Sequence, residues 1–211
     1  MNVGVISCGA SNVTSVTNAI HKIGYKATLL TEPDQKTDFL ILPGVGNFGT
    51  ATVRLNETGF AEYIRSHVDE GKPVIGICLG MQIIFESSAE SEGARGLCIH
   101  EGHFDKLQEP SSRDQSSPPN IGYNFVEFRM QQESHPLEKS FSRLNGYYYF
   151  LHSYALRKEP DTTDVLGVSS FNSEKVIPYT LKENVCGIQF HPERSGYRGL
   201  QLLTETIEFL K

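Results

Sequence analysis

The chain has 211 residues, with 25 acidic and 19 basic side chains that give a formal net charge of −6. This length can bury a substantial core, so we expect a single domain spanning residues 1–211. The acidic balance argues against nucleic acid as the main partner, because such binding needs a basic surface. No apolar run approaches the roughly 18 residues of a membrane span, so we expect no membrane partner.

The cysteines and the N-terminus indicate the compartment. Cys8, Cys78, Cys98 and Cys186 show no paired spacing, which in a chain of this size is typical of free thiols in a reducing environment. The opening "MNVGVIS" lacks the basic region and the cleavage site of a secretion signal. We therefore expect a cytoplasmic protein.

The first half of the chain alternates short apolar runs with segments of helical periodicity. Strands are predicted over 2–7, 26–30, 38–43 and 73–77, and helices over 11–24, 57–71 and 79–88. Ser11 or Asn12 is suited to cap the first helix, and Gly24 to end it. Strands that alternate with helices favour parallel pairing, and strands without polar alternation favour a sheet covered on both faces.

From about Gly96 the pattern changes to short strand candidates with few helices between them. These candidates are 96–107, 123–130, 147–156, 164–171, 176–183 and 185–190. Residues 108–120, rich in Ser and Pro, predict an exposed mobile loop, and Ser195 is suited to cap a final helix. We expect an α/β fold whose open, mostly parallel sheet carries helices on both faces and antiparallel additions in the C-terminal half.

The most informative motif is "GICLG", where Cys78 lies between a predicted strand and a predicted helix. Gly76 and Gly80 frame it in the spacing of the nucleophile elbow G-x-S-x-G, with sulfur in place of oxygen. A sharp turn there projects the thiol at the carboxyl end of the sheet, where free N–H groups of the next helix favour a thiolate. The alternative is a buried cysteine at a glycine-rich strand end. The glycine frame favours a nucleophile.

A thiol nucleophile needs a base and a group that orients the base. His191 follows a predicted buried strand in "GIQFHPERSG", and Glu193 lies two residues further along. The period of two residues in extended chain places both side chains on one side, so Glu193 can hold the imidazole. A solvated His-Pro-Glu turn before a helix is the alternative reading of this segment alone.

A glycine-rich loop, "LPGVGNFG", follows the third predicted strand over 42–49. It matches neither the P-loop nor the dinucleotide-binding fingerprint. The remaining readings are a plain turn or a main-chain surface that lines a substrate and donates N–H groups to an oxyanion.

Together these segments resemble the class I (triad) glutamine amidotransferases. The resemblance rests on "LPGVGNFG", "GICLGMQ", "YYYFLHSY" and "GIQFHPERSG", which occur in the family's order along most of the chain. Within the class, the chain is most similar to the glutaminase subunits of imidazole glycerol phosphate synthases.

The resemblance implies a role for each matching residue. Cys78 attacks the glutamine side chain to form a thioester, His191 moves protons, and Glu193 orients His191. The Leu79 N–H and the main chain around Gly44 and Val45 are implied to form the oxyanion hole. The remaining residues implied to bind glutamine are Gly46, Gln82, Glu90, Ser153 and Tyr154.

The resemblance also implies a partner and a pathway step. Glutamine is hydrolysed to glutamate and ammonia, and the ammonia passes to a (β/α)8-barrel cyclase in a heterodimer. The cyclase makes imidazole glycerol phosphate and the aminoimidazole carboxamide ribonucleotide, a step of histidine biosynthesis. No cofactor and no metal are expected.

Three alternatives stay open at this point. The same glutaminase motifs fit an amidotransferase subunit that feeds ammonia to another acceptor, such as a sugar of a surface polysaccharide. A different cysteine hydrolase on this scaffold is a second alternative, although such proteins usually carry His where Leu79 stands. A binding module with a vestigial site is the third.

Overall fold

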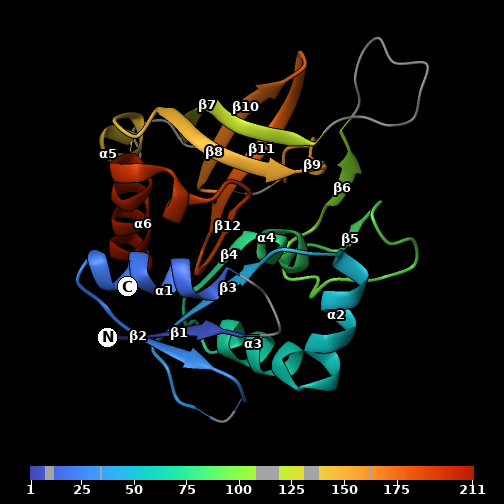
Figure 1. The fold of residues 1–211 in the computed structure, drawn as a ribbon, viewed down its shortest axis with the longest axis vertical. Helices are drawn as coiled ribbons and strands as arrows, with labels where there is room; N and C mark the ends of the chain where they lie inside the picture. Colours follow the sequence, from blue (N-terminus) through green and yellow to red (C-terminus); the bar gives the residue numbers. More distant parts are fainter. Residues whose placement is uncertain (8–11, 34, 108–118, 131–137, 162) are drawn as a thin grey trace.

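A nine-stranded sheet forms the centre of the computed structural model, which describes residues 1–7, 12–33, 35–107, 119–130, 138–161 and 163–211 (Figure 1). The strands, in sheet order, are β2 (Lys26–Leu30), β1 (Asn2–Ile6), β3 (Phe39–Gly44), β4 (Val74–Cys78), β12 (Val185–Ile188), β11 (Glu174–Lys182), β10 (Val165–Phe171), β7 (Asn120–Met130) and β8 (Gly146–His152). Strands β2 to β12 in this order pair in parallel, and the rest pair antiparallel. The predicted α/β sheet with antiparallel additions is confirmed.

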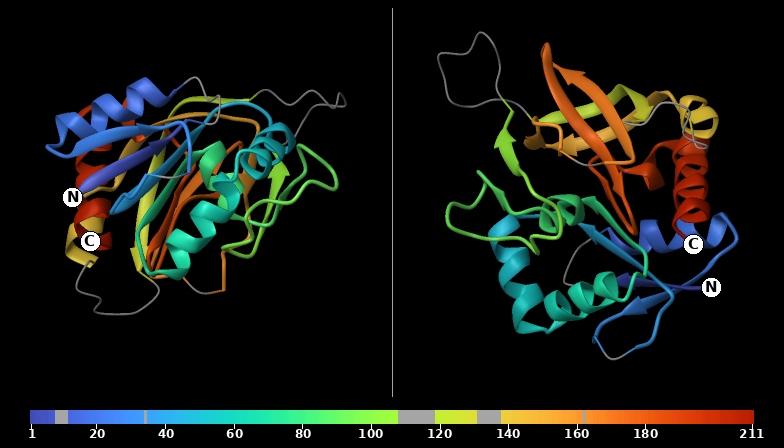
Figure 2. Two further views of the ribbon diagram at one scale, coloured as in Figure 1. Left: turned by 90° about the horizontal axis from the view of Figure 1, so that it is seen from below. Right: turned by 180° about the vertical axis from the view of Figure 1, so that it is seen from behind.

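Helices cover both faces of the parallel part of the sheet (Figure 2). On one face, α1 (Val13–Lys22) and α6 (Gly196–Leu210) pack on β1, β3, β4 and β12 in one apolar cluster. On the other face, α2 (Phe48–Glu57), α3 (Phe60–Asp69) and α4 (Leu79–Ile84) share a second cluster. Every residue of β3, β4 and β12 is buried, which explains why these strands lack polar alternation. Among the described residues, no helix is long and apolar enough to cross a membrane.

A smaller sheet of β5 (Ser87–Ser88), β6 (His103–Lys106) and β9 (Tyr154–Leu156) lies beside the main one. The expected strand 147–156 therefore divides at Ser153 between β8 and β9, which belong to different sheets. The expected strand 96–107 begins only at His103. A short helix, α5 (Glu138–Ser142), and a 3-10 turn, η1 (Pro192–Arg194), complete the elements.

Helix α4 is shorter than the predicted helix 79–88. It ends at Ile84, Phe85 is extended, and Ser88 lies in β5. The free carbonyl groups at the end of α4 accept hydrogen bonds from the loop that follows in the chain. The Leu97 N–H, for example, donates to the Ile83 carbonyl oxygen at 2.7 Å. Tertiary hydrogen bonds therefore replace the next helical turn.

The predicted helix 57–71 begins only at Phe60, because Gly59 adopts a left-handed φ of 78°. Helix α2, which our prediction lacked, precedes it. Asn47 begins α2 by accepting a hydrogen bond from the Thr50 N–H at 3.0 Å, which is the usual role of a capping Asn.

Three further features of the sequence can be compared with the structure: the end of the first helix, the cysteines and the predicted loop 108–120. Gly24, with φ 93°, ends α1 as predicted. Cys186 is buried, whereas Cys98 is exposed and Cys8 lies outside the described residues. The predicted loop 108–120 also lies outside them except for its last two residues, of which Asn120 already belongs to β7.

Gly80 is the tightest contact between α4 and the sheet. A Cβ atom there is 1.8 Å from the Leu42 carbonyl oxygen in β3. We expect Gly80→Ala to force α4 from the sheet and to lower the free energy of unfolding by about 3 kcal/mol or more in chemical denaturation. Gly71→Ala is the control, because Gly71 meets no atom and only its φ of 74° strains an alanine, at a cost of about 1 kcal/mol. Equal losses in the two variants would refute the steric explanation.

Candidate active site

Cys78 ends β4 beside Gly44 of β3, and α4 begins at the next residue. Its backbone has φ 56° and ψ −107°, a left-handed conformation that non-glycine residues seldom adopt. The flanking glycines permit this turn, because a Cβ on Gly76 meets the Gly80 carbonyl oxygen at 2.5 Å. Strain of this kind at a strand–helix junction is typical of a nucleophile elbow.

Two polar groups of the described residues lie within hydrogen-bond distance of the Cys78 sulfur, and motif spacing indicated neither of them. The Leu151 carbonyl oxygen and the Gln189 amide nitrogen each lie 3.8 Å from it. Gln189 is buried, and its amide oxygen has no partner among the described residues. Leu151 belongs to β8, whereas Gln189 follows β12, which pairs in parallel with β4 and so brings Gln189 beside the thiol.

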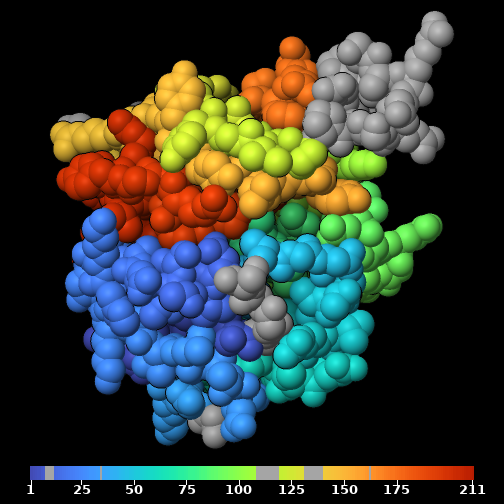
Figure 3. Space-filling view, viewed as in Figure 1, coloured from blue at the N-terminus to red at the C-terminus, as the bar shows by residue number. Residues whose placement is uncertain are grey.

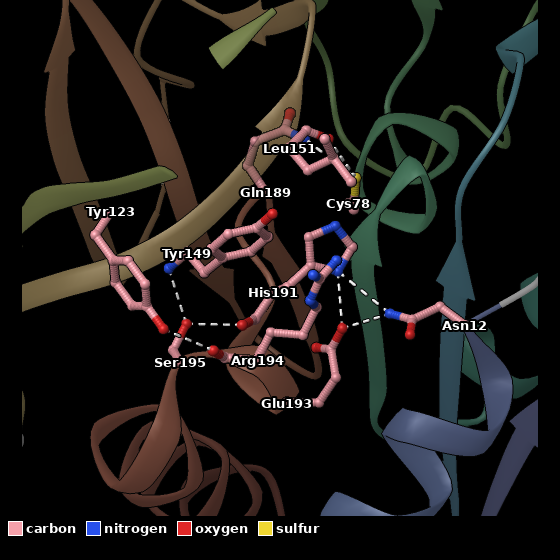
Figure 4. Close-up of polar contacts among 10 residues, drawn as sticks. All are labelled: Asn12, Cys78, Tyr123, Tyr149, Leu151, Gln189, His191, Glu193, Arg194 and Ser195. Atoms are coloured by element: carbon pink, nitrogen blue, oxygen red, sulfur yellow. Dashed lines mark hydrogen bonds and ion pairs between the residues drawn. The ribbon is translucent and has the colours of Figure 1, made fainter. Parts of the chain in front are cut away.

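His191 and Glu193 form a buried pair next to Cys78 (Figure 4). The His191 Nδ1 lies 2.8 Å from the Glu193 Oε1, and neither side chain is more than 1% exposed. The two residues meet through the 3-10 turn η1, and not through the extended chain that we expected. The ring's other nitrogen, Nε2, has no hydrogen bond to a described residue and faces Cys78.

Ser195 holds this turn in place instead of capping α6. Its hydroxyl donates to the His191 carbonyl oxygen at 2.7 Å and accepts from the Tyr149 N–H at 2.9 Å. The His191 N–H donates in turn to the Tyr149 carbonyl oxygen at 2.8 Å. The predicted cap is therefore wrong as a side-chain contact, and the hydroxyl fixes the position of His191 relative to β8 instead.

The environment of His191 favours the charged ring. Burial lowers the pKa of His191, but the interactions with Cys78 and Glu193 outweigh burial and raise the pKa to about 10. A charged imidazole beside a thiol favours the thiolate, which is the nucleophilic form of cysteine. The pair is therefore suited to attack a carbonyl carbon.

A cavity of about 260 Å³ opens beside Cys78, a volume that suits only a small ligand. Its lining is Val45, Gly46, Cys78, Leu79, Gln82, Glu90, Leu151, His152, Ser153 and Tyr154. Of the residues implied to bind glutamine, only Gly44 is absent from this lining. Gly44 lines an adjoining cavity with Val45, Gly46 and Leu79. Glu90 also accepts a hydrogen bond from the Phe48 N–H at 2.6 Å, which ties the cavity wall to the start of α2.

His152 is a second histidine in this lining, and its surroundings keep it neutral. Burial lowers its pKa to about 4. Its Nδ1 donates to the Tyr154 carbonyl oxygen at 2.8 Å, and its Nε2 accepts from the Asn120 amide at 3.1 Å. Both ring nitrogens are therefore occupied, so His152 shapes the wall and His191 is the histidine available for proton transfer. Among the described residues, no group of acidic, His and Cys side chains is arranged to hold a metal ion.

The raised pKa of His191 makes the fold pH-sensitive. Because the folded-state pKa of about 10 exceeds the ordinary value of 6.5, the charged ring stabilises the fold fully below pH 6.5, and this contribution disappears as the pH rises through about 10. We expect Glu193→Gln to destabilise the protein most near pH 6.5, with a difference from the unsubstituted chain that narrows toward pH 10 in denaturant titrations. NMR titration should place the His191 midpoint lower in this variant. A difference in stability that is constant over this range would contradict the assignment.

The chain is similar to known proteins of one family. Residues 4–207 match the family model described as glutamine amidotransferase class-I. The chain is 38% identical to imidazole glycerol phosphate synthase subunit HisH of Halalkalibacterium halodurans, over 95% of this chain and 92% of that protein. It is 34% identical to the HisH subunit of Thermotoga maritima, over 99% and 97% respectively. The imidazole glycerol phosphate synthase hisHF of Emericella nidulans is 36% identical over 92% of this chain, which spans 35% of that longer protein.

Solved structures share the fold at low identity. PurLQS from Thermotoga maritima aligns with a TM-score of 0.74 at 20% identity, covering 100% of this chain and 99% of the matched chain. A crystal structure of a glutamine amidotransferase aligns with a TM-score of 0.73 at 16% identity, covering 99% and 98%. The family model and the relatives agree with the resemblance carried by the four motifs, and the chain belongs to the class I glutamine amidotransferases.

Proposed function

We propose that this chain is the glutaminase subunit of imidazole glycerol phosphate synthase and that residues 1–211 form one glutamine amidotransferase domain. The observation that carries the proposal is the thiol of Cys78, placed between the His191–Glu193 pair and a cavity of suitable size. Relatives named as HisH subunits over nearly the full chain support the choice of synthase.

In the proposed reaction, the Cys78 sulfur attacks the side-chain carbonyl carbon of glutamine. The carbon–sulfur bond forms, the carbon–nitrogen bond breaks, and His191 gives a proton from Nε2 to the leaving nitrogen, which departs as ammonia. His191 then takes a proton from water as the water oxygen bonds to the thioester carbon. The carbon–sulfur bond breaks, which releases glutamate and restores the Cys78 thiolate beside the charged His191. The main chain of Gly44, Val45 and Leu79 is proposed to stabilise the oxyanion. The remaining proposed glutamine contacts are Gly46, Gln82, Glu90, Ser153 and Tyr154.

Strands β7 and β8, in the antiparallel part of the sheet, lie at the surface of the molecule (Figure 3). The β7/β8 apolar strip consists of the exposed residues Ile121, Tyr123, Phe125, Tyr147 and Leu151. Ile121 lies opposite Leu151 and Phe125 opposite Tyr147, and the Phe125 and Tyr147 rings are 5.5 Å apart. An exposed apolar patch on a folded domain is typical of a protein interface.

The strip lies next to the site, because the Leu151 carbonyl contacts the Cys78 sulfur. If a partner covers the strip, strand β8 lies between that partner and the Cys78 sulfur. We propose that this partner is a cyclase subunit of (β/α)8-barrel fold, which receives the ammonia and makes imidazole glycerol phosphate and the carboxamide ribonucleotide.

The test is glutamine hydrolysis by the purified chain, alone and then with a barrel cyclase and its nucleotide ligand. We expect weak activity alone and a strong rise with the partner, and Cys78→Ala should reduce turnover by about 10⁴-fold or more. Cys98→Ala is the matched control, because Cys98 is exposed and lies outside the cavity lining.

The outcomes separate the alternatives. Hydrolysis that depends on Cys78 but ignores the cyclase would contradict the synthase role and point to another acceptor, such as a polysaccharide sugar. Absence of hydrolysis with partner and ligand would contradict the glutaminase itself.

A further inference from the structure

Asn12 stands at the N-cap position of α1, yet its side chain makes no capping hydrogen bond. Asn is among the most favoured N-cap residues, because its side-chain oxygen can accept from the first N–H groups of the helix. Asn47 does so at the start of α2, where its Oδ1 accepts from the Thr50 N–H at 3.0 Å. The same residue type in the same position therefore serves a different purpose at Asn12.

The amide of Asn12 points into the candidate active site (Figure 4). Its Nδ2 donates a hydrogen bond to the Glu193 Oε1 and lies 3.3 Å from the His191 Nδ1. His191 and Glu193 are 179 and 181 positions away in the sequence, so only the tertiary fold brings them to Asn12. Asn12 thus contacts both members of the buried pair.

Glu193 has few other partners. Its side chain is 0% exposed, and its second oxygen, Oε2, has no hydrogen bond to any described residue. Among the described residues, the carboxylate has two donors, the His191 Nδ1–H and the Asn12 amide, which converge on one oxygen. A buried charge with so few donors is strongly affected by the loss of one.

The chemistry of an amide suits this position. The nitrogen must face Glu193, because the opposite orientation would bring two acceptor oxygens together. The Asn12 nitrogen donates to Glu193 and so favours its carboxylate form, which can only accept, and the proton of the 2.8 Å bond between Glu193 and His191 therefore lies on Nδ1. Nδ1 therefore stays protonated and bonded to Glu193, which leaves Nε2 as the nitrogen that exchanges protons on the Cys78 side.

We propose that Asn12 is a positioning residue for glutamine hydrolysis, which orients Glu193 and through it fixes the tautomer and the direction of the His191 ring. The inference rests on the proposed function. Asn12 is absent from the lining of the glutamine cavity, so its effect falls on the proton-transfer steps and not on glutamine binding.

The decisive variants are Asn12→Ser and Asn12→Asp, because both residues are favoured N-caps. Serine withdraws the donor from Glu193, and aspartate keeps the shape but presents an acceptor to it. We expect kcat with the cyclase present to fall by about 10- to 100-fold, the loss typical of one hydrogen bond to a charged group, while KM stays within about twofold. The melting temperature should stay the same or rise in Asn12→Ser, because the hydroxyl can cap α1.

Asn18→Ser is the matched control, since Asn18 is exposed on the same helix. It should leave kcat unchanged. A value of kcat in Asn12→Ser equal to that of Asn18→Ser would overturn the inference, as would a loss of activity that follows a loss of melting temperature in both Asn12 variants.

A second measurement does not depend on turnover. The hydrogen-bonded Nδ1 proton of His191 should give a downfield proton NMR signal in the unsubstituted chain and in Asn18→Ser, and this signal should weaken or shift in Asn12→Ser. An unchanged signal would overturn the inference even if the chain hydrolysed no glutamine. Conversely, a changed signal in an inactive chain would place the failure with the proposed function and not with Asn12.

Discussion

The close approach of α4 to β3 at Gly80 is the contact on which the candidate site depends. With no side chain at Gly80, the helix backbone reaches the Leu42 carbonyl, and the chain turns sharply enough to hold Cys78 at φ 56°. This turn directs the thiol outward at the carboxyl end of the parallel strands, where α/β folds place their ligands. It also brings Gln82, in the first turn of α4, into the cavity wall.

The rest of the site arrives from the second half of the chain. Strand β12 pairs in parallel with β4, so the residues that follow it emerge beside Cys78. Strand β8 then contributes its main chain, through the Leu151 carbonyl near the thiol and the Tyr149 carbonyl that accepts from His191. The nucleophile and its base thus come from different halves of the chain. The antiparallel strands lie between them in the sequence, and two of these strands carry the exposed β7/β8 apolar strip.

The candidate site uses two side chains that would otherwise stabilise the starts of helices. Asn12 and Ser195 both occupy N-cap positions, and neither caps its helix. A missing cap costs about 1 kcal/mol, which the fold tolerates because α1 and α6 are held by one large apolar cluster. The freed side chains bind Glu193 and the His191 main chain instead. Departures from local sequence rules are most common at functional sites, and here both unused N-cap side chains contact His191 or its partner Glu193.

Much of the fold was predictable, because its signals are local. The apolar runs and the helical periodicity indicated the parallel strands and α1, and Gly24 marked where that helix ends. The G-x-C-x-G spacing and the His-Pro-Glu segment indicated the three central residues, since a sharp turn requires glycine and a thiol requires a base. The helix end at Ile84 was mispredicted, because the groups that replace its next turn come from the later loop at Leu97.

What only the tertiary structure decided is which distant groups meet. The sequence by itself determined the fold class, the family and the residues suited to the chemistry, because these follow from periodicity, turn geometry and motif spacing. No local pattern distinguishes Asn12 from an ordinary helix cap, or Gln189 and Leu151 from ordinary strand residues. Asn12 meets Glu193 and Gln189 meets Cys78 because β12 lies beside β4, and Leu151 meets Cys78 through β8. Sheet order is a property of the whole chain and not of any segment.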